Sequence, residues 1–227
     1  MRVVIIGGSH AGIAAARHLK KVNPNVEVLM LERSNVLGYI GSSLNLYLEG
    51  TIADLDEAKT ATVSQLMSEN INVFIDTEAI DIDTEKKEVV ALTKIEQEPT
   101  KDHFSYDYLI LAMGSSQYQT GLSLQSDREI TNYKTLEQAQ QAIDSLNKVN
   151  KIAIIGAGLI GFELVESLTK LRKEIYLIDR MDNVLFRYFD EEITQKLLTK
   201  LPDNVHIILN SNVKEVQLDV NESVSGI

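Results

Sequence analysis

The strongest constraint on the fold is a pattern that occurs twice, about 149 positions apart. Each copy opens with a short run of mostly β-branched residues, at 3–6 and at 152–155, and leads into a glycine-rich loop. Such a run is typical of a strand that is buried on both faces. A helical pattern and a second apolar run follow each loop, which makes each copy a βαβ unit. Two βαβ units at this separation predict two nucleotide-binding domains in tandem.

The segment between the two copies predicts further elements. Acidic residues at the start of 54–70 favour a helix there. A strand is expected at 71–75, and the alternating segments at 78–83 and 87–95 are typical of an antiparallel meander. The apolar run at 106–112 predicts one more strand.

A linker and a second set of elements follow. Seven of the thirteen residues at 115–127 are Ser or Gln, which indicates a linker. Thr135 opens a capping-box pattern, which predicts the start of a helix. A later helix is expected at 190–201, with strands near 205–209 and 213–220.

These elements together predict an α/β fold with two tandem Rossmann-like domains. We expect the first domain at 1–114, with the β-meander inserted in it. The second domain is expected at 115–227 and is incomplete at its C-terminal end, because the sequence stops within an unfinished sheet.

Composition narrows the classes of function. Asp and Glu (33) outnumber Lys and Arg (22), and the net charge of −11 argues against a nucleic-acid partner, whose phosphates such a surface repels. There is no cysteine, so disulfides, thiolate metal ligands and cysteine nucleophiles are excluded. The longest apolar stretch, 152–162, is shorter than the roughly 18 residues that span a bilayer. The N-terminus lacks a signal-peptide core, so we expect a soluble cytoplasmic protein with no membrane partner.

The second loop, Gly156-Ala157-Gly158-Leu159-Ile160-Gly161, is a complete G-x-G-x-x-G pattern. The first glycine permits the tight turn, the second lets a pyrophosphate approach the backbone, and the third lets helix and strand pack closely. Asp179 stands 23 residues after Gly156, where a carboxylate accepts hydrogen bonds from the ribose hydroxyls and repels a 2′-phosphate. We therefore expect NADH to bind roughly tenfold or more tightly than NADPH.

The first loop departs from this pattern. Gly7 and Gly12 hold the outer positions, but Ser9 stands in place of the middle glycine, and its Cβ restricts backbone approach. The serine hydroxyl is able to donate a hydrogen bond to a phosphate. Glu32, 25 residues after Gly7, is placed to hold a ribose, and Gly114 would let backbone pass close to the same nucleotide. A Rossmann-like core without a ligand remains the alternative.

Two such domains with a meander between them resemble the flavoprotein pyridine nucleotide–disulphide reductases, and most closely the branch of NADH peroxidase, NADH oxidase and coenzyme A-disulphide reductase. The resemblance is carried by Gly7-x-Ser9-His10-x-Gly12, Glu32, Leu44-x-Leu46-Tyr47-Leu48-Glu49-Gly50, Tyr106-Asp107-x-Leu109-Ile110, Gly156-x-Gly158-x-Ile160-Gly161-x-Glu163 and Asp179. In that family the first domain binds FAD and the second binds NADH. The resemblance implies the same two cofactors here.

The resemblance also implies a set of residues for each cofactor. For FAD the set is Gly7, Gly8, Ser9, Gly12, Glu32, Arg33, Ser42, Leu111, Ala112, Met113 and Gly114. For NADH the set is Gly156, Gly158, Leu159, Ile160, Gly161, Asp179 and Tyr188. The implied catalytic residues are His10, Ser42 and Glu163, and no metal site is implied. Tyr188 is equally well explained as a surface aromatic, and Glu163 as a first-turn acid that stabilises its helix.

Ser42 is the main departure from the family, which has its redox-active cysteine at this position. A serine hydroxyl forms no accessible thiolate and is not oxidised to a sulfenic acid. Peroxidase or disulphide chemistry through this residue is therefore excluded, and we expect oxygen reduction to release hydrogen peroxide. His10, which neighbours that cysteine in the family, either hydrogen-bonds Ser42 or is a structural residue at the start of its helix.

We expect an FAD-dependent NADH oxidoreductase of the oxidase type, which passes electrons to oxygen or a small acceptor without a protein thiol. The alternatives are a reductase that passes electrons to a carrier protein, and a non-catalytic, truncated nucleotide-binding remnant. Members of the family continue well beyond this length and end in a dimerisation domain, so the full-length form is expected to be a homodimer. For the 227 residues alone we expect weak FAD binding and exposed sheet edges.

Overall fold

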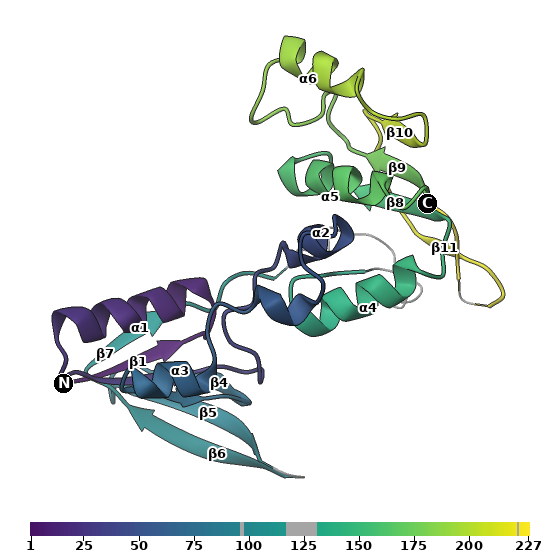
Figure 1. The fold of residues 1–227 in the computed structure, drawn as a ribbon. Helices are drawn as coiled ribbons and strands as arrows, with labels where there is room; N and C mark the ends of the chain where they lie inside the picture. The colour runs from purple at the N-terminus through teal and green to yellow at the C-terminus, as the bar shows by residue number, and fades with distance from the viewer. Residues whose placement is uncertain (96–97, 117–130, 222) are drawn as a thin grey trace. The chain divides into compact units, whose positions relative to one another are not determined.

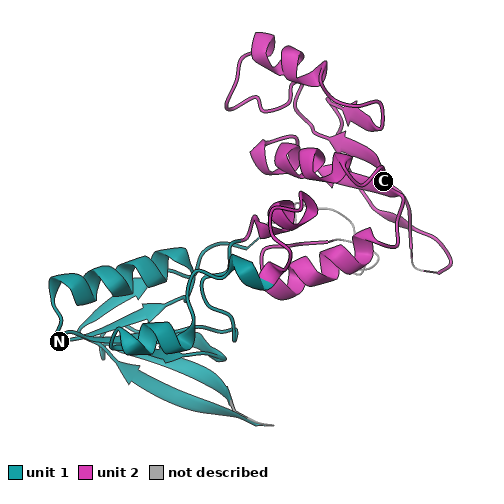
Figure 2. Cartoon of the chain, viewed as in Figure 1, with its two compact units in different colours: residues 1–40, 56–117 teal, residues 41–55, 118–227 magenta. Residues whose placement is uncertain are grey.

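The computed structural model describes residues 1–95, 98–116, 131–221 and 223–227 (Figure 1). The chain divides into two compact units, each of which is described by itself. Unit 1 comprises residues 1–40 and 56–117, and unit 2 comprises residues 41–55 and 118–227 (Figure 2). Most of the linker predicted at 115–127 lies outside the described residues.

Unit 1 contains a parallel sheet with the strand order β3-β2-β1-β7. These strands are β1 (Arg2–Ile6), β2 (Glu27–Leu31), β3 (Ile71–Phe74) and β7 (Tyr108–Leu111). Helix α1 (His10–Val22) connects β1 to β2, and α3 (Val63–Ser68) precedes β3. Strand β1 lies between two parallel neighbours, with Ile5 opposite Met30 on one side and Ile110 on the other.

Both faces of β1 are covered, which explains its unbroken apolar sequence. Successive side chains of a strand point to opposite faces of the sheet. Val3 and Ile5 pack with residues of α1 on one face, and Val4 and Ile6 pack with Val89 on the other. Burial on both faces, predicted from the sequence, is therefore confirmed for β1.

The second face of this sheet is covered by the predicted meander, which has three antiparallel strands. They are β4 (Thr77–Asp83), β5 (Glu88–Ile95) and β6 (Glu98–Ser105). The sequence predicts only the first two, because β6 is mostly polar and exposed and lacks an apolar pattern. Phe104 of β6 is an exception, and it packs edge-on against Phe74 with 5.1 Å between ring centroids.

The single helix predicted over 54–70 is wrong. The structure has a 3-10 helix, η1 (Leu55–Ala58), and then the separate helix α3. The Thr62 hydroxyl accepts a hydrogen bond from Gln65 N, and the Gln65 side chain accepts one from Thr62 N. This capping box starts a new helix inside the predicted one.

Unit 2 contains a second parallel sheet, with the strand order β10-β9-β8. Its strands are β8 (Lys151–Ile155), β9 (Glu174–Ile178) and β10 (Val205–Ile208). Its helices are α2 (Ser43–Leu48), α4 (Leu136–Leu146), α5 (Leu159–Thr169) and α6 (Glu191–Leu198), and a small antiparallel pair is formed by β11 (Gln217–Leu218) and β12 (Val224–Gly226). The capping box predicted at Thr135 starts α4, and the predicted α/β fold with parallel sheets is confirmed.

Strand β8 differs from its counterpart β1 in burial. The sequence predicts that both are buried on both faces, but Ile155 is 51% exposed and Ala153 is exposed as well. Within the described ranges β8 is an edge strand, and no meander covers its second face. The prediction is therefore wrong for β8, because an apolar run shows that a strand is suited to burial and not what covers it.

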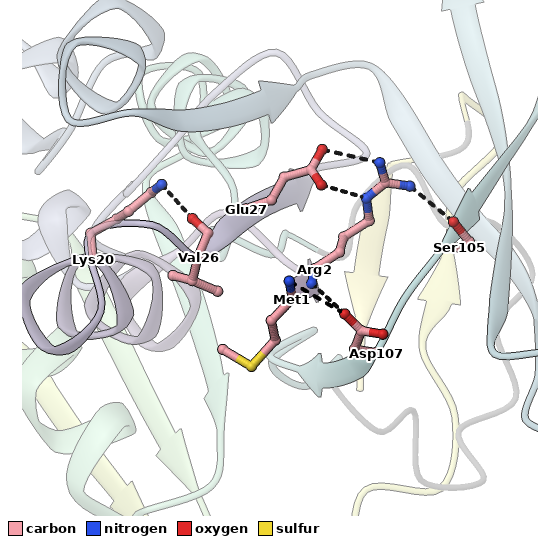
Figure 3. Close-up of polar contacts among 7 residues, drawn as sticks. All are labelled: Met1, Arg2, Lys20, Val26, Glu27, Ser105 and Asp107. Atoms are coloured by element: carbon pink, nitrogen blue, oxygen red, sulfur yellow. Dashed lines mark hydrogen bonds and ion pairs between the residues drawn. The ribbon is translucent and has the colours of Figure 1, made fainter.

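A network of polar contacts joins the starts of β1 and β2 to the end of β6 and the residue before β7 (Figure 3). Arg2 donates from Nε and Nη2 to the two carboxylate oxygens of Glu27, at 2.8 and 3.1 Å, and from Nη1 to Ser105 Oγ at 2.9 Å. Asp107 Oδ2 accepts a hydrogen bond from the backbone N–H of Arg2 at 2.6 Å. The hydrogen bonds from Arg2 lower the pKa of Glu27 below its ordinary value.

Candidate nucleotide-binding sites

In unit 2, the predicted G-x-G-x-x-G loop links the end of β8 to the start of α5. Gly156 has a φ of +111°, which residues with a side chain rarely adopt. A Cβ at Gly161 would lie 1.9 Å from the carbonyl oxygen of Gly156, so α5 packs against the turn only with glycine there. A Cβ at Gly158 would meet nothing within 4 Å, so the space beside this residue is open to a ligand.

Helix α5 begins at this open position without a side-chain cap. Its N-cap residue is Gly158, which has no side chain that could accept a hydrogen bond from the first N–H groups of the helix. The first N–H groups of a helix have no partner within the helix, and they attract anions such as phosphates. The loop therefore combines room for a phosphate with donors suited to one.

Asp179 directly follows β9, and it holds the glycine loop by one of its two hydrogen bonds. Its Oδ2 accepts from Ala157 N at 2.6 Å, and its Oδ1 accepts from Met181 N at 2.9 Å. Because Ala157 lies inside the loop, this carboxylate holds the loop in place. Each carboxylate oxygen accepts more than one hydrogen bond, so Asp179 keeps capacity for ribose hydroxyls.

Unit 1 repeats this arrangement with different residues. Gly7 has a φ of +110°, and a Cβ at Gly12 would lie 1.9 Å from the carbonyl oxygen of Gly7. Glu32, directly after β2, accepts a hydrogen bond from Gly8 N at 2.7 Å through Oε2. Its Oε1 accepts from the N and Oγ of Ser34, at 2.9 and 2.8 Å. An acid at the end of the second strand thus fixes the glycine loop in both units.

The segment after β7 lies against the first loop. A Cβ at Gly7 would lie 2.2 Å from the carbonyl oxygen of Ala112, so no side chain fits between them. Gly114 has a φ of +71° and open space around it, and the neighbouring side chains of Leu111 and Met113 are exposed. The structure therefore brings the predicted FAD residues at the ends of β1, β2 and β7 to one edge of the sheet.

Ser9, which replaces the middle glycine, is the N-cap residue of α1. Its hydroxyl makes no capping hydrogen bond, and its Oγ lies 3.2 Å from Nδ1 of His10. The side chains of Ser9, His10 and Arg33 are all exposed. The hydroxyl thus stays at the surface of the loop, beside the start of α1.

Ser42 and Glu163 both lie in unit 2. Ser42 is the exposed N-cap residue of α2 and makes no side-chain capping hydrogen bond. Glu163 is exposed on α5, and α2 packs against α5, with Ser167 Oγ donating to Glu49 Oε1 at 3.0 Å. His10 belongs to unit 1, so its hydrogen bond to Ser42 stays a prediction.

Two buried polar atoms in unit 2 are not predicted from the sequence. In the part of the chain that the structure describes, neither the Tyr133 hydroxyl nor Asn45 Oδ1 has a hydrogen-bond partner. Burial, together with the charge of Glu163, raises the pKa of Tyr133. A tyrosine ahead of a capping box and an asparagine within a short apolar helix form no motif, so no sequence signal marks either residue.

Tyr188 lies in a segment that is tied to the second glycine loop. Leu185 N donates to Ala157 O at 2.8 Å, and Tyr188 N donates to Leu185 O at 2.8 Å. The Tyr188 side chain is 58% exposed. A contact with adenosine and a simple surface position therefore both stay open for this residue.

Two kinds of site are absent from the described residues. None of their helices combines the length and apolar character needed to cross a membrane. Nor do they contain a cluster of three or more His, Asp or Glu side chains that could hold a metal ion.

Comparison with known proteins identifies similar chains. The family model described as pyridine nucleotide-disulphide oxidoreductase matches residues 1–225. A curated relative, an NADH oxidase of Lactococcus lactis subsp. cremoris, is 34% identical over 198 residues, which cover 86% of this chain and 44% of the relative. The chain spans about half the length of the curated relatives it matches.

Solved structures give the same picture. The water-forming NADH oxidase from Lactobacillus brevis, bound to NADH, is 28% identical with a TM-score of 0.89, and the match covers 97% of this chain and 49% of that one. An engineered water-forming NADPH oxidase, a mutant of that enzyme bound to NADPH, is 27% identical with a TM-score of 0.89 and the same coverage.

Proposed function

Because the chain belongs to the pyridine nucleotide-disulphide oxidoreductase family, we propose that it is the cofactor-binding part of an FAD-dependent NADH oxidoreductase of the oxidase type. In this proposal residues 1–114 form the FAD domain and residues 115–227 form the NADH domain. A cytoplasmic location and a homodimeric full-length form belong to the same proposal.

One observation carries the proposal: each unit has a glycine loop that is fixed by an acid at the end of the next strand. Gly8 N donates to Glu32, and Ala157 N donates to Asp179, at 2.7 and 2.6 Å. Rossmann-type sites bind dinucleotides through this combination, with pyrophosphate at the helix N-terminus and the acid on a ribose. A unit with this arrangement is therefore suited to one dinucleotide, and the chain has two.

The residues present fit both cofactors. In unit 2, the open space at Gly158 and the start of α5 suit the pyrophosphate of NADH, and Asp179 suits its adenosine ribose. In unit 1, the Ser9 hydroxyl is a donor for the FAD pyrophosphate, Glu32 suits the ribose, and the space at Gly114 leaves room for the cofactor. FAD, when bound, supplies the electron transfer between NADH and the acceptor, and the chain binds and orients both partners.

NADH is the proposed nucleotide because Asp179 repels a 2′-phosphate. The exchanges in the engineered NADPH oxidase point to the same residue type, since an aspartate of the parent enzyme becomes alanine and the residue after it becomes arginine. This chain has Asp179 and Arg180 in succession. It therefore combines an acid that favours NADH with an adjacent arginine.

Oxygen is the proposed acceptor and hydrogen peroxide the proposed product. The chain has no cysteine, and Ser42 stands where the family has its redox-active cysteine. A serine hydroxyl is too weakly acidic to attack a peroxide as a thiolate does. Further reduction to water, named for the relative from Lactobacillus brevis, is therefore not expected from these residues.

The absorption spectrum of the purified chain in the presence of added FAD tests the proposal. We expect a flavin band that NADH bleaches in the absence of oxygen. Gly158→Val fills the open space in unit 2 and leaves unit 1 intact, so this variant should keep the flavin band but lose the bleaching at low NADH concentration. A flavin band that NADH leaves unchanged would instead support a non-catalytic nucleotide-binding remnant.

The product is tested by oxygen uptake during NADH oxidation, with and without catalase. We expect about one hydrogen peroxide per NADH, so that catalase returns part of the oxygen. Consumption of two NADH per oxygen without an effect of catalase would contradict the thiol-free mechanism. Bleaching by NADH without oxygen uptake would favour a reductase that serves a carrier protein.

A further inference from the structure

The segment that follows β9 contains an arginine, Arg180, whose backbone is held beside the glycine loop. Asp179, the residue before it, accepts hydrogen bonds from Ala157 N and Met181 N. The residue after it is held too, because Met181 O accepts a hydrogen bond from Asn210 N at 2.9 Å. The backbone is therefore anchored on both sides of Arg180.

The Arg180 side chain, in contrast, has no partner among the described residues. It is exposed, and within the described ranges its guanidinium makes no hydrogen bond or ion pair. The other arginine of this segment, Arg187, lies over the ring of Phe186, with 5.4 Å from its Cζ to the ring centroid. Arg180 is thus an unpaired cation directly next to the residue proposed to hold the adenosine ribose.

This position is significant because NADPH differs from NADH by a phosphate on that ribose. An acid at the ribose disfavours the phosphate, and a nearby arginine accommodates it. Guanidinium is well suited to this role, since it stays charged and donates two parallel hydrogen bonds to phosphate oxygens. Asp179 and Arg180 therefore have opposite effects on the binding of NADPH.

We propose that Arg180 binds the 2′-phosphate of NADPH and that unit 2 accepts NADPH alongside NADH. This inference rests on the proposed function of unit 2 as the nicotinamide-nucleotide domain. Asp179 keeps its hydrogen bonds from Ala157 N in the loop and from Met181 N, and the charge of Arg180 offsets the repulsion between Asp179 and the phosphate. Asp179 alone is expected to favour NADH about tenfold. We expect that preference only in a variant that lacks the Arg180 charge.

The test measures the dissociation constants of NAD⁺ and NADP⁺ by isothermal titration calorimetry, so that no electron transfer interferes. In the unmutated 227-residue chain the two constants should differ by less than about tenfold. Arg180→Ala should weaken NADP⁺ by about tenfold, because a charge-assisted contact is lost, and leave NAD⁺ unchanged. Arg180→Lys keeps the charge, so its dissociation constant for NADP⁺ should lie between those of the unmutated chain and of Arg180→Ala.

Arg187→Ala is the matched control, because it removes the same charge from the same segment. It should leave both constants unchanged. If it weakens NADP⁺ as much as Arg180→Ala does, or if Arg180→Ala weakens both nucleotides equally, the inference is overturned. A preference for NAD⁺ well above tenfold in the unmutated chain overturns it too. Failure of every variant to bind either nucleotide refutes the proposed function itself, and is distinguishable by that complete loss.

Discussion

The two glycine loops have nearly the same backbone, with a φ of +110° at Gly7 and +111° at Gly156, and they differ in what surrounds them. The carbonyl oxygen of Ala112 lies 2.2 Å from the place of a Cβ on Gly7, whereas nothing lies within 4 Å of a Cβ on Gly156. Both turns need glycine for their dihedral angle, and the first needs it for space as well. The βαβ unit thus determines the backbone conformation of the loop, and the strands outside that unit determine how closely neighbouring residues enclose the loop.

Matched Gly→Ala exchanges should separate the requirement for a positive φ from the requirement for space. They should lower the unfolding free energy more than the other exchanges proposed below. Gly7→Ala adds a clash with Ala112 to the strain of a positive φ, and should cost about 3 kcal/mol or more of the unfolding free energy. Gly156→Ala carries only the strain and should cost about 1–2 kcal/mol. Urea unfolding of both variants measures the difference. Equal losses would mean that the enclosure by Ala112 has no energetic weight.

The acids that hold the loops should give a smaller difference. Glu32 accepts three hydrogen bonds and Asp179 accepts two. An amide keeps one acceptor oxygen, so Glu32→Gln should cost about 2 kcal/mol of the unfolding free energy and Asp179→Asn about 1 kcal/mol. Glu78→Gln, an exchange of an exposed residue on β4, is the control for lost charge. An equal effect of this control would assign the loss to net charge and not to the loops.

Features that depend on residues close together in the sequence could be predicted, and features that depend on contacts between distant segments could not. The glycine loops and the positions of Glu32 and Asp179 are predicted because a tight turn demands glycine and an acid is expected at the end of the second strand, at a fixed spacing. The ribose contacts of the two acids stay a prediction. The exposure of Ile155 was not predicted, since it depends on which strands cover β8. The burial of Asn45 and of the Tyr133 hydroxyl likewise depends on packing between segments far apart in the sequence.

The described residues of each unit include a capping box, and exchanges at the two boxes test whether the units unfold separately. Thr62 caps α3 in unit 1, and Thr135 caps α4 in unit 2. Each Thr→Ala exchange should cost about 1 kcal/mol, because an N-cap hydrogen bond is lost, and Thr→Ser should cost little. Hydrogen exchange should show the loss only in the unit that contains the variant. Loss of protection in both units from one exchange would show that they unfold together.

The ion pairs at the start of the two sheets should give the smallest effect. Arg2 binds both oxygens of Glu27, whereas Lys151 Nζ lies 3.5 Å from one oxygen of Glu174. Since the pKa of Glu27 is lowered from 4.5, the pair stabilises the fold above that pH and the stabilisation is lost as the pH falls through the lowered value. Glu27→Gln should therefore cost about 0.5 kcal/mol at neutral pH, a value limited by solvent exposure, and nothing at strongly acidic pH. Glu174→Gln should change the unfolding free energy less.

Unfolding measurements at neutral and acidic pH check this order. The difference between the unmutated chain and Glu27→Gln should shrink as the pH is lowered. A difference that stays constant with pH would contradict the assignment to the carboxylate charge.

The hydrogen bonds from Gly8 N to Glu32 and from Ala157 N to Asp179 have a consequence for the speed of binding. We expect these bonds to hold each glycine loop before a nucleotide binds, so that the arriving nucleotide has no loop to rearrange. Association then lacks a slow conformational step, and its observed rate constant should rise in proportion to nucleotide concentration and not level off. The two carboxylates would thus determine how quickly each nucleotide is captured, in addition to which ribose is accepted.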